Sequence, residues 1–381
     1  MHGANGIDSS EHADEYYLYE RYQKPKRTRP LVSLYYQFRP LIPRSVQLAL
    51  RRRYARAQAK VSFPSWPIES ILVDKQNREF KIRLLAGKES RLPFMHYWPH
   101  GNRASVVLTH DVETAKGVSN IPRLRKLEQK YHVLSSWNFV PERYRFDRRV
   151  LQDLRDEGCE IGVHGLHHDG RLFSSRAIFE KSLPRINAYL REWDAVGFRS
   201  PSTQRNADWM PLIAAKYDSS FPDTDPFEPQ PGGCCSIFPY FLGNMVELPI
   251  TMPQDHTLFA ILRQNDISIW KKKATWLIEK HGMVLANIHP DYMLTAKDLR
   301  YYEELLDFLT SRDELWYALP RDVAGWWRQR AESKINTSQS GRVTIQGPAR
   351  TKGAIAWVTL DNGTVRYTVG SSKATNSRHK R

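Results

Sequence analysis

The middle of the chain alternates short apolar runs with stretches in which apolar residues recur every three or four positions. Buried strands are predicted at four of the runs: 104–109, 133–140, 160–163 and 283–288. Helices are predicted at four of the periodic stretches: 121–131, 148–157, 210–217 and 270–281. Strands that alternate with helices in this way indicate a βα architecture with a parallel sheet or barrel.

Polar side chains follow three of the predicted strands. Asp111 lies two residues past the first strand, whereas His164 and His289 come directly after the third and the fourth. In parallel βα folds the carboxyl ends of the strands, with the loops after them, form the active-site face. We therefore expect Asp111, His164 and His289 to converge on one site.

The residues before this region are basic and aromatic. The formal net charge of the chain is +16, and a helix is predicted over 45–60. Its apolar face would contain Val46, Ala49, Leu50, Tyr54 and Ala57. Such a helix can pack on its own domain with its arginines in solvent. It can also lie on an anionic membrane, bound through Arg51, Arg52, Arg53 and Arg56. Nucleic-acid binding is not expected, because no base-reading module accompanies the charge.

After about Gln329 the composition changes to serine, threonine, glycine and basic residues. Short strands are predicted at 342–345, 354–360 and 364–369, and Asp361-Asn362-Gly363 is typical of a hairpin turn. We expect a small β-rich appendage, followed by a basic, disordered tail over 371–381.

The overall composition is that of a folded protein, with 41% hydrophobic and 26% charged residues. Three cysteines are too few for a disulfide framework, so reduced thiols are expected. The first 20 residues carry acidic side chains and lack the basic start and apolar run of a secretory signal. No apolar run reaches the roughly 18 residues that cross a bilayer. We expect a cytoplasmic protein.

The candidate chemistry lies in two short segments. His164 and His168 are four residues apart, so both imidazoles can face one metal ion if the segment turns helically, with His167 pointing elsewhere. Such a pair alone is weak evidence, because most histidines at this spacing are surface or core residues. Asp111 and Glu113 are two residues apart beside a buried strand and can point the same way. One acid can then bind a metal while the other works as a base.

Four motifs in order resemble those of the polysaccharide deacetylase family, also called carbohydrate esterase family 4. The family carries a Thr-Phe-Asp-Asp motif, a His-Ser/Thr-x-x-His motif, an Arg-x-Pro motif and a late histidine after an apolar strand. The corresponding residues here are Thr109 to Glu113, His164 to His168, Arg199-Ser200-Pro201, and His289. The Asp-Val-Glu sequence is similar to a divergent branch of the family. Two further departures are Gly165 in place of Ser or Thr, and Asn287 in place of Leu.

The resemblance implies a distorted (β/α) barrel over 104–330. A basic helical extension over 1–103 precedes this catalytic domain, and the β-rich appendage and tail over 331–381 follow it. The resemblance also implies that Glu113, His164 and His168 bind a divalent metal, with Zn²⁺ expected. Asp111 would then be the base.

His289 is expected to protonate the leaving group, since an imidazolium suits that task near pH 7. Asp223, Asp225 or Asp291 would orient it. Arg199 resembles the family arginine that pairs with the catalytic carboxylate. We expect substrate contacts from Asp225, His256 and Asp291.

The expected function is metal-dependent removal of an N-acetyl or O-acetyl group from a saccharide, such as a cytoplasmic precursor of a cell-surface polysaccharide, with possible peripheral contact at the inner membrane. Two alternatives remain. The same fold could hydrolyse a small non-sugar amide or ureide, because the cluster specifies hydrolysis and not the group attacked. The departures at Gly165 and Asn287 and the basic ends also suit a non-catalytic saccharide-binding or membrane-surface scaffold.

Overall fold

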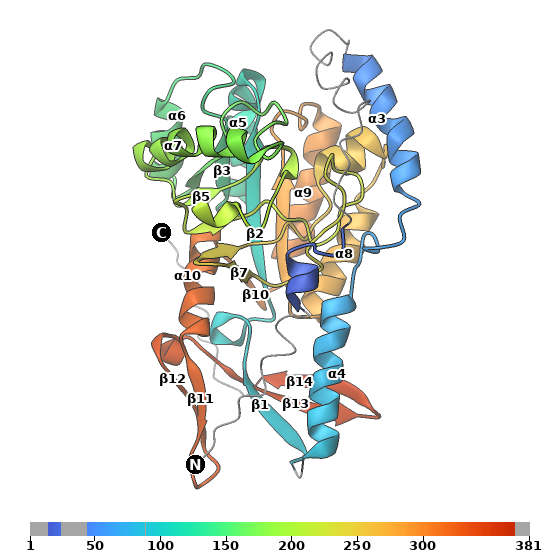
Figure 1. Cartoon of the computed structure of the whole chain (residues 1–381), viewed down its shortest axis with the longest axis vertical. Coiled ribbons are helices and arrows are strands. Elements are labelled where there is room, and N and C mark those ends of the chain that lie inside the picture. The colour runs from blue at the N-terminus through green and yellow to red at the C-terminus, as the bar shows by residue number, and fades with distance from the viewer. Residues whose placement is uncertain (1–13, 24–43, 88, 370–381) are drawn as a thin grey trace.

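The computed structural model describes residues 14–23, 44–87 and 89–369. A wide part, built mostly from the middle of the chain, lies above a narrow part in which segments from before and after it pair (Figure 1). None of the helices in these residues combines the length and apolar character that a bilayer-spanning segment needs.

The wide part is built on a mixed sheet in which eight strands curl through 240° into a half-barrel. In sheet order these strands are β10 (Leu315–Tyr317), β2 (Ala104–Val112), β3 (Ser136–Phe139), β4 (Glu160–Val163), β5 (Gly197–Phe198), β6 (Tyr217–Asp218), β8 (Met245–Glu247) and β7 (Tyr240–Leu242). A further strand, β9 (Met283–Ile288), pairs in parallel with β2. Past β8, the Met252 N–H donates to the Leu285 carbonyl of β9 at 3.0 Å, so the curl brings this segment against β9. The expected distorted (β/α) barrel is therefore confirmed.

The central strands are buried on both faces. Every residue of β2, β3, β4 and β9 is buried, which is the pattern of parallel strands covered by helices. The helices of this part are α5 (Ala115–Lys130), α6 (Arg149–Asp156), α7 (Arg176–Glu192), α8 (Ser268–Glu279), α9 (Ala296–Thr310) and α10 (Pro320–Ala331). The apolar spacing in α5 buries Ile121 and Leu124 against the sheet, as the sequence predicts.

The predicted strands at the four apolar runs are confirmed, as are the helices at 121–131, 148–157 and 270–281. The predicted helix over 210–217 is wrong. The structure has only a single 3₁₀ turn in this range, η4 (Met210–Leu212). Tyr217 and Asp218 form strand β6. These two residues pair with β5 on one side and β8 on the other, so sheet pairing overrides the helical spacing.

The predicted basic helix is present as α3 (Arg44–Gln58), and it packs on the half-barrel. The prediction that its arginines lie in solvent is wrong for Arg51 and Arg52. Arg51 donates to the Phe227 carbonyl, and Arg52 donates to the Ala260 carbonyl from two nitrogens at 3.0 and 3.1 Å. Carbonyl groups in a loop, as at Phe227, or near the end of a helix, as at Ala260 in η5 (His256–Ile261), can accept such bonds, which explains why these cations face inward.

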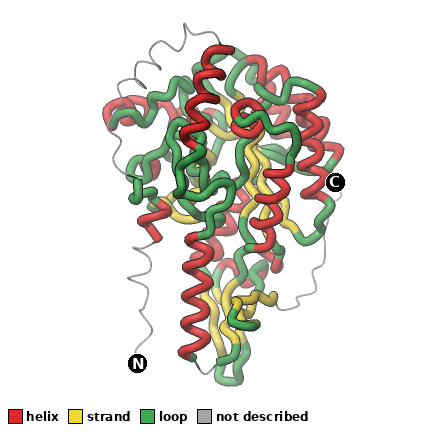
Figure 2. The backbone as a smooth tube through the Cα atoms, turned by 90° about the vertical axis from the view of Figure 1, so that its right-hand side faces the viewer, coloured by secondary structure: helices red, strands yellow, loops and turns green. Residues whose placement is uncertain are grey.

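The narrow part contains a three-stranded antiparallel sheet in the order β1 (Arg91–Met95), β13 (Ile355–Asp361), β14 (Thr364–Val369). Helix α4 (Ile71–Ala86) runs alongside these strands (Figure 2). A separate hairpin joins β11 (Lys334–Thr337) and β12 (Val343–Gln346). The strands predicted after residue 340 are thus confirmed.

The turn between β13 and β14 has the predicted hairpin form. Asn362 and Gly363 have φ of 48° and 75°, the left-handed values that a two-residue hairpin turn requires. Strand β1, which lies before residue 104, shares its sheet with the appendage strands. The predicted tail at 371–381 lies outside the described residues.

Candidate active site

The carboxyl ends of β2, β4 and β9 hold the predicted polar residues. Asp111 is near the end of β2, and His164 and His289 directly follow β4 and β9. The Oδ2 atom of Asp111 lies 3.9 Å from the Nε2 atoms of both histidines. The expected convergence of these three side chains is confirmed.

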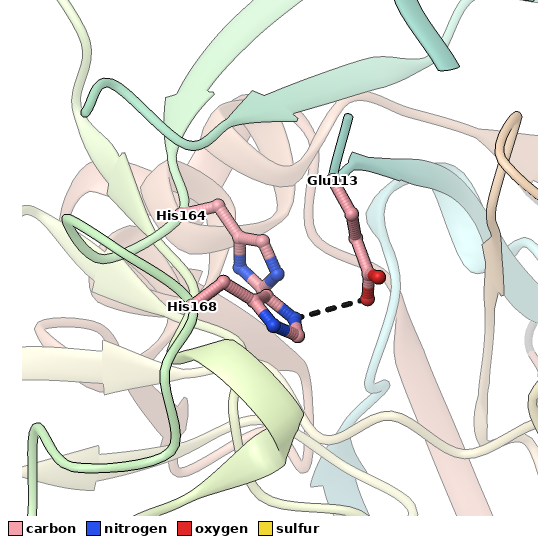
Figure 3. Close-up of side chains that lie close together, drawn as sticks. All are labelled: Glu113, His164 and His168. Carbon is pink, nitrogen blue, oxygen red and sulfur yellow. Dashed lines mark ion pairs between the residues drawn. The ribbon is translucent and has the colours of Figure 1, made fainter. Parts of the chain in front are cut away.

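Glu113, His164 and His168 form a compact group beside Asp111. Each offers one ligand atom, and these atoms lie within 4.8 Å of one another. Figure 3 shows the two imidazoles of the loop after β4 facing the carboxylate that follows β2. The closest pair is His168 Nε2 and Glu113 Oε1, at 3.0 Å.

The loop at 164–168 does not turn helically, and that part of the prediction is wrong. Instead, Gly165 and His168 have φ of 64° and 52°, so two left-handed residues fold the loop back. His167 points away, as expected, and its Nε2 lies 3.4 Å from Glu142 Oε2. The ring centroids of His164 and His168 end up 5.1 Å apart.

The nitrogen atoms of this loop suit a metal ion. His164 Nδ1 lies 3.0 Å from the Arg199 carbonyl oxygen, a contact that puts its proton on Nδ1 and leaves Nε2 as a free acceptor. The His164 Nε2 atom and the His168 Nδ1 atom are buried without a hydrogen-bond partner among the described residues, whereas His168 Nε2 faces Glu113. Buried polar atoms are seldom left unpaired. Two imidazoles and a carboxylate form a common zinc ligand set.

Asp111 is held by amide and guanidinium groups. The Asn138 amide donates to Oδ1 at 2.9 Å, and the Asn287 amide donates to Oδ2 at 2.8 Å. Arg199 Nη1 lies 3.6 Å from Oδ2. Burial raises the pKa of Asp111, but Arg199 and the two histidines outweigh it and hold that pKa below its usual range. The carboxylate is therefore charged and can accept a proton.

His289 is oriented by Asp255. Its Nδ1 lies 2.6 Å from Asp255 Oδ1, and its backbone N–H donates to Oδ2 at 2.9 Å. Burial lowers the pKa of His289, but Asp255 and the neighbouring carboxylates raise it to about 10. The Nε2 atom is 3.9 Å from both Asp111 Oδ2 and Glu113 Oε1, so it faces the center of the cluster.

The expectation that Asp223, Asp225 or Asp291 orients His289 is wrong. Asp223 pairs with Lys273, and Asp225 accepts the backbone N–H of Phe227 at 2.8 Å. Asp255 lies 34 residues before His289, and no spacing rule connects two residues that only the curl of the sheet brings together.

No family model matches the sequence, and no curated protein matches it. Among solved structures, a Mycobacterium smegmatis protein described as a polysaccharide deacetylase superposes with a TM-score of 0.50 at 19% identity, covering 61% of this chain and 93% of that one. The chain has the polysaccharide deacetylase fold. Two further matches score 0.48: a Puue allantoinase at 14% identity, covering 62% and 94% of the two chains, and a Pseudomonas aeruginosa PAO1 protein described as a polysaccharide deacetylase at 16% identity, covering 61% and 94%.

Within this polysaccharide deacetylase fold, Arg199 lies beneath the site. Besides its approach to Asp111, it donates from Nη2 to Ser219 Oγ at 2.8 Å, and its side chain is fully buried. The arginine therefore contributes charge to Asp111 while it is anchored on the neighbouring strand end.

The three predicted substrate-binding residues occupy different places. Asp291 accepts hydrogen bonds from the Glu113 N–H at 2.8 Å and from the Thr114 hydroxyl, so it holds the turn after β2. The His256 ring lies 4.7 Å from the Tyr292 ring, and Tyr292 donates to Glu113 Oε2 at 3.3 Å. Asp225 is buried, and burial together with a nearby glutamate raises its pKa to about 8.

A buried chain of polar groups starts at Asp111. The Asn287 amide, which donates to Asp111, also donates to Gln254 Oε1 at 3.1 Å. Gln254 in turn donates to Glu228 Oε1 at 3.1 Å. The sequence pointed to Asn287 only as a departure from the family motif, and nothing in it pointed to Gln254 or Glu228.

Proposed function

We propose that the chain is a divalent-metal-dependent deacetylase that removes an acetyl group from a saccharide. The observation that carries this proposal is the placement of an ionised Asp111 and of His289 beside the three potential ligands Glu113, His164 and His168. Amide hydrolysis needs an activated water, a polarised carbonyl and a proton for the leaving nitrogen. The five side chains can provide for all three needs.

A divalent cation held by Glu113, His164 and His168 would supply Lewis acidity toward the acyl oxygen. We propose Zn²⁺, because the ligand set combines two imidazoles with one carboxylate. The unpaired His164 Nε2 atom and the approach of His168 Nε2 to Glu113 support this assignment.

Asp111 would take a proton from the attacking water, since its neighbours keep it ionised. His289 would give a proton from Nε2 to the leaving nitrogen. Asp255 holds the opposite ring nitrogen, and this contact fixes the direction in which Nε2 points.

We further propose that the substrate is a saccharide precursor inside the cell. Cys159, Cys234 and Cys235 are all buried and free, which is in keeping with a reducing compartment.

The experiment uses purified chain, added zinc, and a panel of N- and O-acetylated sugars beside a small amide and a ureide. Acetate release from the sugars is expected. Hydrolysis of the amide or the ureide, without acetate release from any sugar, would assign the activity to small non-sugar substrates. A chain that binds zinc but turns over nothing in the panel would overturn the proposal.

Two variants separate metal binding from chemistry. Glu113→Ala should lose metal in elemental analysis, because one of the three ligands is removed. Asp111→Asn should keep the metal while turnover falls by roughly two to four decades, the range expected for a lost general base. The opposite pattern would reverse the roles of the two acids.

A further inference from the structure

Helix α3 turns its polar side toward the half-barrel. Arg51 and Arg52 donate to the Phe227 and Ala260 carbonyls, and Gln58 donates to the Glu228 carbonyl at 3.2 Å. Ala55, on the same side, is 3% exposed. These four residues lie at helical spacing on one face. The packed face of α3 is thus built mainly from polar and charged side chains.

The opposite face carries large apolar side chains in solvent. Val46, Leu50 and Tyr54 follow one another at four-residue spacing and are 45%, 47% and 43% exposed. Arg53 and Arg56 are exposed beside them. A surface helix ordinarily buries its apolar stripe and exposes its cations. In α3 this arrangement is reversed, so the apolar stripe is available to a partner outside the described residues.

We propose that this face of α3, defined by Val46, Leu50, Tyr54, Arg53 and Arg56, binds an anionic lipid surface. The stripe would enter the boundary between headgroups and acyl chains, a depth at which a tyrosine is well placed. The arginines beside it would meet lipid phosphates. No aspartate or glutamate lies between Arg21 and Lys60, so no acidic side chain of this segment opposes the approach.

The position of α3 gives this contact a consequence for the site. The helix is bonded to residues 227 and 228, and Glu228 begins the buried chain through Gln254 and Asn287 to Asp111. Helix α3 is therefore linked, through residues 227 and 228, to the buried polar groups that reach Asp111, and its outer face would hold this side of the fold against the lipid surface. Saccharides carried on membrane lipids would be the substrates within reach, an extension that rests on the proposed function.

The test is co-sedimentation of the full chain with vesicles. Pelleting is expected with equal parts of phosphatidylcholine and phosphatidylglycerol, and not with phosphatidylcholine alone. Binding should weaken from 0.1 M to 1 M salt, because the Debye length falls from about 10 Å to about 3 Å. The double variant Arg53→Gln/Arg56→Gln should bind roughly thirtyfold more weakly, at about fivefold for each arginine near the surface. Leu50→Ser/Tyr54→Ser should also lose binding.

The matched control is Ile82→Ser/Leu85→Ser in α4, where two apolar residues are 59% and 70% exposed on a helix that also carries Asp74 and Glu79. This variant should bind as the unchanged chain does. Circular dichroism checks that every variant is folded. Equal pelleting of all variants, or none by the unchanged chain, would overturn the proposal; in the second case the stripe is covered by other residues of the chain or by a protein. Acetate release from a soluble sugar is measured separately, so failure of membrane binding leaves the proposed function standing.

Discussion

The Nδ1 atom of His289 lies 2.6 Å from a carboxylate oxygen of Asp255, and the second oxygen of the same carboxylate accepts the His289 backbone N–H at 2.9 Å. This double contact fixes both the position and the orientation of the imidazole ring. It leaves Nε2 as the atom that faces Asp111 and Glu113. Asp255 itself is almost fully buried, at 1% exposure.

Asp255→Asn should therefore impair chemistry and spare metal binding. The asparagine keeps the shape but offers no charge to stabilise a protonated His289, and general acid catalysis contributes on the order of 10²–10⁴ in rate. We expect turnover to fall about a hundredfold, with zinc content unchanged in elemental analysis. The conservative Asp255→Glu should recover part of the rate. Loss of zinc in Asp255→Asn would assign Asp255 to the metal site instead.

Local patterns in the sequence predict some residues of this site but none of the contacts between residues from different strands. Asp111, His164 and His289 could be predicted because each follows an apolar run that marks a buried strand. Asp255 and Gln254 could not, because they lie in a loop whose place is set by the curl of the sheet. Strands β5 and β6 have two residues each, which is too short for any periodicity.

The inverted orientation of α3 has a similar origin. The apolar spacing of Val46, Leu50 and Tyr54 predicted the helix correctly. It also predicted that these residues would face the protein, and they face solvent instead. Which face packs depends on acceptors elsewhere in the chain, here the carbonyl oxygens of Phe227 and Ala260. No pattern within 44–58 contains that information.

Asn287 connects Asp111 to the rest of the buried polar chain. Its amide donates to Asp111 at 2.8 Å and to Gln254 at 3.1 Å. Asn287→Leu would restore the residue usual in the resembling family and remove both bonds. A hydrogen bond to a charged group is worth about 1.5–3 kcal/mol, so we expect turnover to fall at least about tenfold while zinc is retained.

Thr109→Val is the matched control for Asn287→Leu. The Thr109 hydroxyl contacts Asn287 Oδ1 at 3.2 Å and the Ala286 carbonyl at 3.0 Å, whereas the Nδ2 atom of Asn287 is the one that donates to Asp111. This variant should keep nearly full turnover. If both variants lose activity equally, general disturbance of β2 and β9 explains the loss better than the bond to Asp111 does.

Gly165 is required by the shape of the loop that carries His164 and His168. Its φ is 64°, and a Cβ placed on it would lie 2.5 Å from Cγ of Pro201. Gly165→Ser, which restores the residue type usual in the resembling family, should therefore destabilise the fold and loosen the metal-ligand group. We expect a loss of roughly 1–3 kcal/mol in unfolding free energy together with reduced zinc content.

The control for Gly165→Ser is Gly341→Ser. Gly341 also has a left-handed φ, 79°, but a Cβ there would meet nothing within 4 Å. This variant measures backbone strain without a collision, a cost of about 1 kcal/mol. Equal unfolding free energies and equal zinc contents for the two variants would show that Pro201 moves to make room for the new side chain without a loss of stability.

Glu160, the first residue of β4, should make stability fall as pH rises. Its carboxylate is 2% exposed and accepts hydrogen bonds from the Tyr217 hydroxyl at 2.8 Å and the Arg321 N–H at 3.0 Å. Burial raises its pKa from 4.5 to about 7, although these bonds oppose the shift. The folded state therefore binds a proton more tightly than the unfolded state does. Glu160 favours folding fully below pH 4.5, and this contribution is lost as pH rises through 7.

Glu160→Gln removes this titration and keeps a neutral side chain of similar shape, whose amide oxygen can accept the Arg321 N–H while its amide nitrogen donates to the Tyr217 hydroxyl oxygen. The difference in unfolding free energy, variant minus unchanged chain, should rise by roughly 2–3 kcal/mol from pH 5 to pH 8. Each unit of pKa shift corresponds to about 1.36 kcal/mol. Denaturant unfolding at the two pH values measures the difference. Glu180→Gln, in which an exposed carboxylate pairs with Arg176, controls for the loss of one negative charge and should show little such gain. A gain of equal size in both variants would assign the effect to net charge and not to the burial of Glu160.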